Sequence, residues 1–108
     1  MIRQLDARHL HEWIADDGRD PPALLDVREA WEVALCAIEG SIAIPMSEIP
    51  GRLHEIDRAR EWVVVCHHGL RSQQVAMLLQ QEGFPQVHNL HGGIDAWARI
   101  VDPGMRQY

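Results

Sequence analysis

A change of hydrophobic pattern in the middle of the chain most constrains how this sequence can fold. Trp62–Val65 is an uninterrupted β-branched and aromatic run, typical of a strand buried on both faces of a parallel sheet. After Ser72 the apolar residues fall at positions 75, 76, 78 and 79, which is the spacing of an amphipathic helix. Only a short loop, from Cys66 to Arg71, separates the two patterns. The sequence therefore predicts a strand, a tight loop and a helix in immediate succession.

The loop between this strand and helix carries groups suited to holding an anion beside a thiol. Ser72 is a favourable N-cap residue, so backbone N–H groups and the positive end of the helix dipole are expected to converge above Cys66. Thiols at helix N-termini beside cationic groups have pKa values of roughly 3.5–7.5, against about 8.5 for a free cysteine. Arg71 can bind an oxyanion through two donors, and Gly69 permits a turn that a Cβ would obstruct. Cys66 is therefore a candidate nucleophile, with a buried structural cysteine as the alternative.

Strand-like and helix-like segments alternate along the rest of the chain. The expected strands are residues 2–5, 23–27, 42–44, 62–65 and 87–90. The expected helices are residues 7–16, 29–35, 73–82 and 94–100, with interrupted helical stretches over residues 46–60. This order predicts an α/β fold with a mainly parallel central sheet and helices on both of its faces.

Several side chains have expected places in this fold. Leu10, Trp13 and Ile14 are expected to form the buried stripe of the first helix, and Trp31 to be a packing residue. Asp26 and Arg28 stand at the carboxyl end of a central strand, where ligand-facing groups of open α/β sheets collect. We interpret these two as supporting residues of a site, while a local ion pair that ties adjacent loops explains them equally well.

The length and charge of the chain limit the classes of protein to which it can belong. Its 108 residues, 46% of them hydrophobic, fit one domain, expected over residues 1–108. Ten basic and sixteen acidic residues give a net charge of −6, which argues against a nucleic-acid partner or an anionic membrane surface. No stretch approaches the roughly 20 apolar residues of a membrane span, and residues 1–6 lack a signal peptide's apolar region. We expect a cytoplasmic protein whose two cysteines are thiols.

Three motifs follow one another along the chain. They are Leu25-Asp26-Val27-Arg28-Glu29 with Trp31-Glu32 after it, Cys66-His67-His68-Gly69-Leu70-Arg71-Ser72, and Leu90-His91-Gly92-Gly93-Ile94-Asp95-Ala96-Trp97. In this order they resemble the Asp-x-Arg stretch, the active-site loop and the last-helix segment of the rhodanese, or thiosulfate sulfurtransferase-like, family. The chain departs from the family at residues 36–41, which read Cys-Ala-Ile-Glu-Gly-Ser where the family usually has Gly-His-Ile-Pro-Gly-Ala.

The resemblance implies a single rhodanese-like domain that transfers sulfur. The Cys66 thiolate would take the outer sulfur of a small anionic donor such as thiosulfate, become a persulfide, and yield the sulfur to a thiol or cyanide-like acceptor. A protein could also be the donor or the acceptor. The implied catalytic residues are Cys66 and Arg71. The implied substrate-binding loop consists of His67, His68, Gly69, Leu70 and Ser72. Neither a cofactor nor a metal is expected.

Two other classes of function remain open at this point. Cysteine phosphatases and arsenate reductases also combine a thiolate, a nest of N–H groups and an arginine, but they resemble Cys-x5-Arg. Here four residues separate Cys66 from Arg71, which shortens the ring by about 3.5 Å, and the loop has no Asp to act as a general acid. A non-catalytic binding or regulatory module would usually lack the nucleophile. A metal site would draw on Cys66, His67, His68, His88 and His91, but adjacent histidines chelate poorly.

Overall fold

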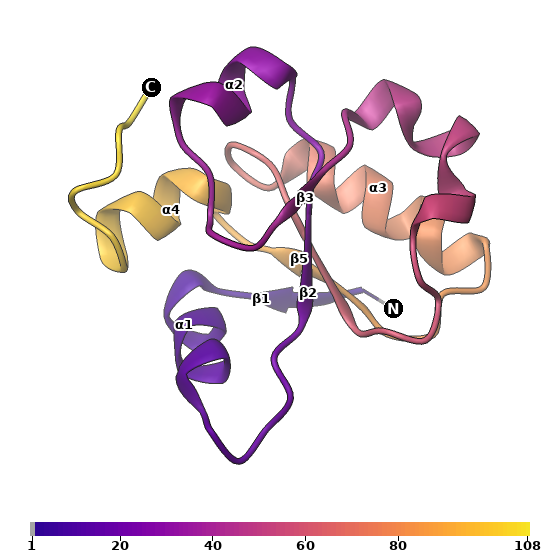
Figure 1. Cartoon of the computed structure of the whole chain (residues 1–108), viewed down its shortest axis with the longest axis horizontal. Helices are drawn as coiled ribbons and strands as arrows, with labels where there is room; N and C mark the ends of the chain where they lie inside the picture. Colours follow the sequence, from indigo (N-terminus) through magenta and orange to yellow (C-terminus); the bar gives the residue numbers. More distant parts are fainter. Residues whose placement is uncertain (1) are drawn as a thin grey trace.

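A computed structural model describes residues 2–108 and shows a parallel sheet built around the Trp62–Val65 run. Its strands are β1 (Arg3–Leu5), β2 (Ala23–Asp26), β3 (Ile42–Ala43), β4 (Trp62–Val65) and β5 (Val87–Leu90). They lie in the order β1-β5-β4-β2-β3, and every pairing is parallel (Figure 1). Strand β4 therefore lies between two neighbours, and all four of its residues are buried, as the apolar run predicts.

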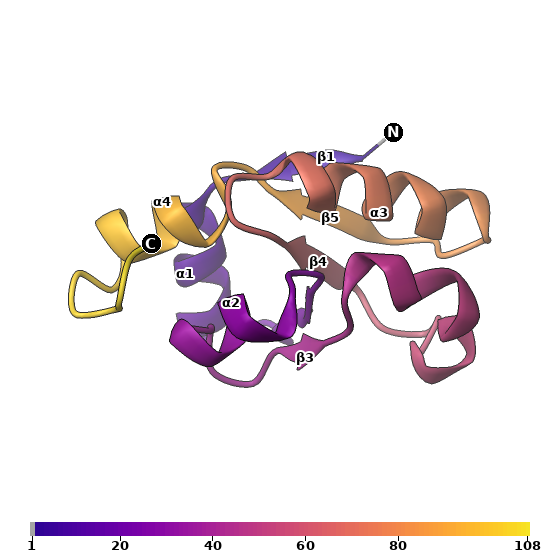
Figure 2. The ribbon, with the colours of Figure 1, turned by 90° about the horizontal axis from the view of Figure 1, so that it is seen from above.

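Helices cover both faces of this sheet. They are α1 (Ala7–Ala15), α2 (Ala30–Leu35), α3 (Leu70–Gln81) and α4 (Gly93–Ile100), with the 3-10 helices η1 (Met46–Gly51) and η2 (Leu53–Glu55). Figure 2 shows α1 and α4 together on one side of the strands, and α3 with the 3-10 helices on the other. Val63 and Val65 accordingly belong to the core beneath α1 and α4, while Trp62 and Val64 belong to the opposite core. The predicted α/β architecture is confirmed.

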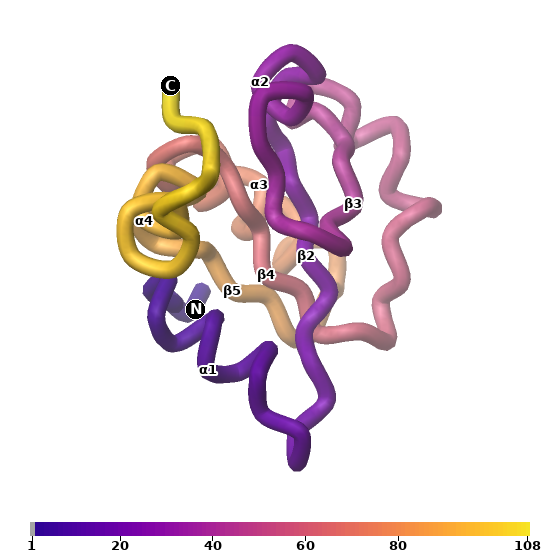
Figure 3. The backbone as a smooth tube through the Cα atoms, turned by 60° about the vertical axis from the view of Figure 1, so that its left-hand side comes forward, coloured from indigo at the N-terminus to yellow at the C-terminus, as the bar shows by residue number. Residues whose placement is uncertain are grey.

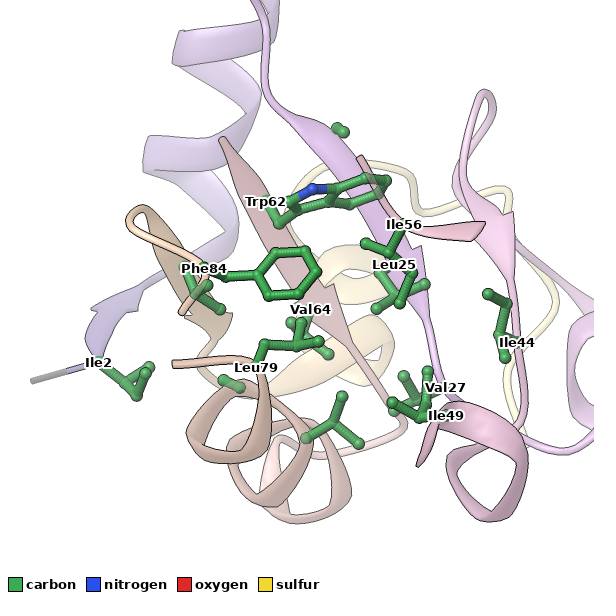
Figure 4. Packing of buried hydrophobic residues seen from close by; sticks show 14 of the residues in the cluster. Ile2, Leu25, Val27, Ile44, Ile49, Ile56, Trp62, Val64, Leu79 and Phe84 are labelled. Atoms are coloured by element: carbon green, nitrogen blue, oxygen red, sulfur yellow. The ribbon is translucent and has the colours of Figure 1, made fainter. Parts of the chain in front are cut away.

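The core beneath α3 shows how that helix is joined to the sheet. Figure 4 shows Leu79 and Phe84 beside Trp62 and Val64 of the central strand. At the end of the helix Gly83 has φ +92°, the Phe84 N–H donates to the Leu79 carbonyl at 3.0 Å, and the Gly83 N–H donates to the Gln80 carbonyl at 3.1 Å. This pair of hydrogen bonds is a Schellman motif, which turns Phe84 back onto the helix.

Ile14, expected in the buried stripe, is partly exposed, and Trp31, expected to be a packing residue, packs at the surface. In α1, Leu10 and Trp13 are buried, but Ile14 is 40% exposed because it lies in the last turn and borders an open groove beside Trp97. Trp31 is 63% exposed. Helix α2 is short and turns only Glu32 inward, so the indole of Trp31 packs against another ring outside the core.

Within residues 2–108, no helix has the length and apolar character needed to cross a membrane. The cytoplasmic location and the domain limits of 1–108 remain predictions from the sequence.

The start of α4 is fixed against the loop that follows β4. The Ile94 N–H donates to the Cys66 carbonyl at 2.8 Å, and the Asp95 N–H donates to the His67 carbonyl at 3.0 Å. Gly93 has φ +61°, and a Cβ at that position would lie 2.5 Å from the Cys66 carbonyl oxygen. Only glycine allows this approach without displacing the loop.

We expect Gly93→Ala to lower the free energy of unfolding by at least roughly 1–3 kcal/mol, because a Cβ is strained in this backbone conformation and would collide with the loop. Denaturant unfolding measures the change. The matched control is Gly51→Ala, where the backbone is not left-handed and an added Cβ meets no described atom within 4 Å. Equal losses at the two positions would contradict the interpretation.

Candidate active site

The sulfur of Cys66 lies at the floor of the loop that leaves the central strand. The residue directly follows β4 and is 1% exposed. The Gly69 N–H donates to its Sγ at 3.0 Å, and the Ser72 hydroxyl lies 3.2 Å from the same atom. The thiol therefore faces hydrogen-bonding groups at the start of α3, as expected of a nucleophile at a helix N-terminus.

Helix α3 begins earlier than the sequence pattern predicted. Gly69, with φ +108°, is its N-cap, and Leu70 is its first residue. The prediction that Ser72 caps the helix is wrong, because Ser72 lies within the first turn and its buried side chain has other partners. The left-handed conformation of Gly69 turns the chain directly from strand to helix, so three residues follow Cys66 before the helix starts.

A polar chain runs from Ser72 across the sheet. The Ser72 hydroxyl donates to Oδ1 of Asn89, which is buried on β5. The Asn89 amide in turn donates to the Gly69 carbonyl at 3.2 Å and to Oε1 of Gln4 at 2.8 Å. The Ser72 hydroxyl has one proton and two neighbours, so it can accept from a Cys66 thiol or donate to a thiolate. Sequence reasoning missed Asn89, although an amide at the carboxyl end of a short apolar strand was a usable signal.

The side chain of Arg71 forms an ion pair with Glu32 of α2. Its Nη1 and Nη2 donate to Oε1 and Oε2 of Glu32 at 2.6 and 2.9 Å. Both terminal nitrogens of the guanidinium are thus hydrogen-bonded to α2, and oxyanion binding by Arg71 stays a prediction. The pair raises the pKa of Arg71, and the hydrogen bonds from Arg71 lower the pKa of Glu32 to about 2, against the effect of burial.

The supporting residues Asp26 and Arg28 form a second ion pair. Arg28 Nη2 donates to Oδ2 of Asp26 at 2.7 Å, and neither residue is exposed. Burial lowers the pKa of Arg28, but hydrogen bonds to Asp26 and Tyr108 outweigh burial and raise it overall. Nη2 also donates to the carbonyl of Cys36 at 2.6 Å. This bond holds the start of the segment in which the sequence departs from the family pattern.

Tyr108 joins the two ion pairs. Its hydroxyl donates to Oε2 of Glu32 at 2.7 Å and accepts from Nη1 of Arg28 at 3.0 Å. Burial raises the pKa of Tyr108 to about 12. Sequence reasoning missed both Tyr108 and Glu32 as site residues. The spacing of Glu29 and Glu32 signals a capping box at α2, which the structure contains, but no local pattern marks Tyr108.

The remaining loop residues differ in exposure. His67 is half-buried and stacks on Tyr108, with ring centroids 3.9 Å apart. Burial, followed by the neighbouring His68, lowers the pKa of His67, which favours its neutral form. His68 is exposed, and Leu70 is 79% exposed. The expected substrate-binding loop therefore presents His68 and Leu70 to solvent and keeps Ser72 inside.

Among residues 2–108, one group of side chains has the composition of a metal site. Ligand atoms of His67, His68 and Asp95 lie within 4.8 Å of one another. The two imidazoles are stacked, with centroids 4.0 Å and planes 27° apart, and they belong to adjacent residues, which chelate one ion poorly. His88, also considered from the sequence, is bonded to Glu61. The arrangement is poorly suited to a tetrahedral ion.

Because the folded-state pKa of Glu32 is lowered from 4.5 to about 2, its charge stabilises the fold above pH 4.5, and this stabilisation is lost as the pH falls toward 2. We expect a loss on the order of 3 kcal/mol over that range. In Glu32→Gln this part of the pH dependence should be missing, as measured by denaturant unfolding at several pH values. Glu55→Gln, which removes an exposed partner of Arg52, should flatten the profile less. Identical profiles for wild type and Glu32→Gln would contradict the assignment.

Comparisons with known proteins agree with this geometry. The rhodanese-like domain family matches residues 6–100. A sulfurtransferase of Allochromatium vinosum is 38% identical over 99 residues, which cover 92% of this chain and 91% of that protein. The crystal structure of SSP1007 from Staphylococcus saprophyticus has a TM-score of 0.84 and 31% identity, covering 98% of this chain and all of that one. A rhodanese-like domain protein from Staphylococcus aureus also has a TM-score of 0.84, with 27% identity and 99% coverage of both chains. The chain therefore belongs to the rhodanese-like domain family.

Proposed function

We propose that the protein is a sulfurtransferase that carries sulfane sulfur on Cys66, with thiosulfate as one donor. The Cys66 thiolate attacks the outer sulfur of thiosulfate, and the bond between its two sulfurs breaks, so that sulfite leaves with the electron pair. The product is a persulfide anion on Cys66. An acceptor nucleophile such as cyanide then attacks the terminal sulfur and restores the thiolate. Neither step requires an external oxidant or reductant.

The observation that carries this proposal is the environment of Sγ. A backbone N–H and a hydroxyl lie within hydrogen-bond distance of a buried sulfur at the start of a helix. The Gly69 N–H stabilises negative charge on sulfur without having to reorganise, and the Ser72 hydroxyl adds a second hydrogen bond when its proton turns from Asn89 to the sulfur. They therefore suit an anionic persulfide as well as the thiolate that precedes it.

Arg71 contributes in a different way from the one the sequence suggested. Its guanidinium forms two hydrogen bonds with the Glu32 carboxylate and so joins the first turn of α3 to α2. The positive charge of Arg71 remains near Cys66. We therefore assign Arg71 the fixing of the loop and a favourable field for an anionic donor. Direct binding of donor oxygens is not part of the assignment.

The burial of Cys66 limits its reaction partners. With 1% of the residue exposed, the sulfur suits small anions and thiols, or a cysteine that projects from a partner protein. The net charge of −6 disfavours nucleic acid and anionic membranes as partners. A cytoplasmic location belongs to the same proposal, because a reducing compartment keeps both cysteines available as thiols.

Phosphoryl chemistry is the rival enzymatic function. Four residues separate Cys66 from Arg71, and none of them is an Asp that could protonate a leaving group. In addition, both terminal nitrogens of Arg71 are hydrogen-bonded to Glu32. These observations favour sulfur transfer over phosphate ester hydrolysis. The presence of the cysteine at the start of α3 favours sulfur transfer over a non-catalytic module, which would usually lack the nucleophile.

The assignment predicts that Cys66, and not Cys36, is required for turnover. Cys66→Ser should abolish thiosulfate-to-cyanide sulfur transfer, whereas Cys36→Ser should retain it, because only Cys66 faces the start of α3. Thiocyanate production by the three proteins measures this. Activity that survives in Cys66→Ser, or wild type that hydrolyses aryl phosphates faster than it transfers sulfur, would reject the proposal.

Arg71→Lys should not behave as a mild substitution. Lysine offers one nitrogen where the guanidinium offers two to Glu32, so the link between α2 and α3 loosens. Loss of about 1.5–3 kcal/mol from a charge-assisted bond corresponds to at least about a tenfold fall in kcat/KM for thiosulfate. The matched control is Arg52→Lys, which changes an exposed arginine that also forms a fork, to Glu55. Equal activity of Arg71→Lys and wild type would show that the loop backbone suffices.

A further inference from the structure

The segment after α4 folds back toward α2, so that the C-terminus lies beside α2 in both Figure 1 and Figure 3. Tyr108 lies at the end of this segment and touches the site from outside the sheet. We propose that Tyr108 is a positioning residue for the Cys66 loop: its hydroxyl holds Glu32 and through it Arg71, and its ring holds His67. The proposal deepens the proposed sulfur transfer and rests on it.

The hydroxyl of Tyr108 forms a hydrogen bond with one member of each ion pair, Arg28 and Glu32. Oε2 of Glu32 accepts from Tyr108 at 2.7 Å and from Arg71 Nη2 at 2.9 Å. Arg28 Nη1 donates to the Tyr108 hydroxyl at 3.0 Å, while its other contacts, with the Glu32 carbonyl and the Cys36 sulfur, are longer at 3.3 and 3.8 Å. One hydroxyl therefore bridges the Asp26–Arg28 pair and the Glu32–Arg71 pair.

The protonation state of Tyr108 suits this bridging role. Burial, together with the nearby Glu32 carboxylate, raises the pKa of Tyr108 to about 12. The phenol thus keeps its proton at neutral pH and can donate to Glu32 while it accepts from Arg28. A bridge of this kind fixes the carboxylate plane, and the carboxylate plane fixes the guanidinium of Arg71.

The ring of Tyr108 acts on the other side of the loop. It lies nearly parallel to the His67 imidazole, with centroids 3.9 Å apart and planes 12° apart. Trp31 packs edge-on against Tyr108 at 5.8 Å, so the phenol ring lies between α2 and the loop. His67 is the residue after Cys66. Removing the ring would free the His67 side chain and open one side of the loop to solvent.

The two contacts can be separated by substitution. Tyr108→Phe removes the hydroxyl and keeps the stacked ring, so kcat/KM for thiosulfate should fall about tenfold while alkylation of Cys66 by iodoacetamide keeps its rate. Tyr108→Ala removes both contacts, so alkylation of Cys66, followed by peptide mass spectrometry, should become several times faster as well. Ile100→Ala is the control, because Ile100 is 56% exposed at the end of α4 and takes part in neither contact, and both rates should stay at wild-type values. Faster alkylation in Tyr108→Phe, or unchanged transfer in it, would overturn the inference.

A double-mutant cycle tests whether the hydroxyl acts through Glu32. In a Glu32→Gln background, adding Tyr108→Phe should change kcat/KM less than about twofold, because Arg71 has already lost the carboxylate through which the hydroxyl positions it. A further full tenfold fall would show that the hydroxyl acts elsewhere and would overturn the inference. If the hydroxyl contributed only to stability, Tyr108→Phe would lower the free energy of unfolding by the same amount in the wild-type and Glu32→Gln backgrounds.

The same cycle, measured as the free energy of unfolding, separates this inference from the proposed function. Unfolding requires no sulfur donor, so coupling between Tyr108 and Glu32 is measurable even in a protein that transfers no sulfur. Coupling in unfolding together with an inactive wild type would support the contact and reject sulfur transfer. Additive effects in unfolding would overturn the inference whatever the activity of the wild type.

Discussion

The chain has to leave the central strand β4 and enter α3 within residues 66–69, and much of the site follows from that constraint. Gly69 makes the turn in a left-handed conformation, which brings its N–H to within 3.0 Å of the Cys66 sulfur. The carbonyls of Cys66 and His67 point the opposite way and accept from the first N–H groups of α4. Two helix starts thus meet at one loop: one faces the sulfur, and the other satisfies the buried carbonyls.

The two ion pairs beside the loop fix the relative positions of the elements that surround it. Desolvation offsets much of the Coulombic gain of a buried pair, yet loss of one partner typically costs about 3–5 kcal/mol because the other charge is stranded. The Asp26–Arg28 pair is therefore difficult to rearrange once formed, whereas solvent weakens this effect in the Glu32–Arg71 pair, where the Arg71 side chain is 35% exposed. They tie β2, α2 and α3 together around the loop, and the tyrosine that bridges them lies on a segment far from all three in sequence.

The parts of the structure that were predictable depend on neighbours in sequence. The apolar run of β4 is a local signal, and it was interpreted correctly. The orientation of Arg71 was not predictable, because it depends on Glu32, 39 residues away. Ser72 was predicted to be the N-cap because serine is a favoured N-cap residue, but its hydroxyl donates to Asn89 on another strand. The strand–loop–helix pattern and the family resemblance both pointed to Cys66 as the candidate nucleophile, whereas the pairing of polar groups around it required the fold.

The central claim, that Cys66 carries sulfur, is tested most directly by mass spectrometry of the intact protein and of its peptides after incubation with thiosulfate. The account predicts a gain of one sulfur atom on the peptide that contains Cys66, which disappears on addition of cyanide or a reductant. The peptide that contains Cys36 should keep its mass throughout. Sulfur found on Cys36, or no gain on either peptide while thiocyanate is still produced, would contradict the account.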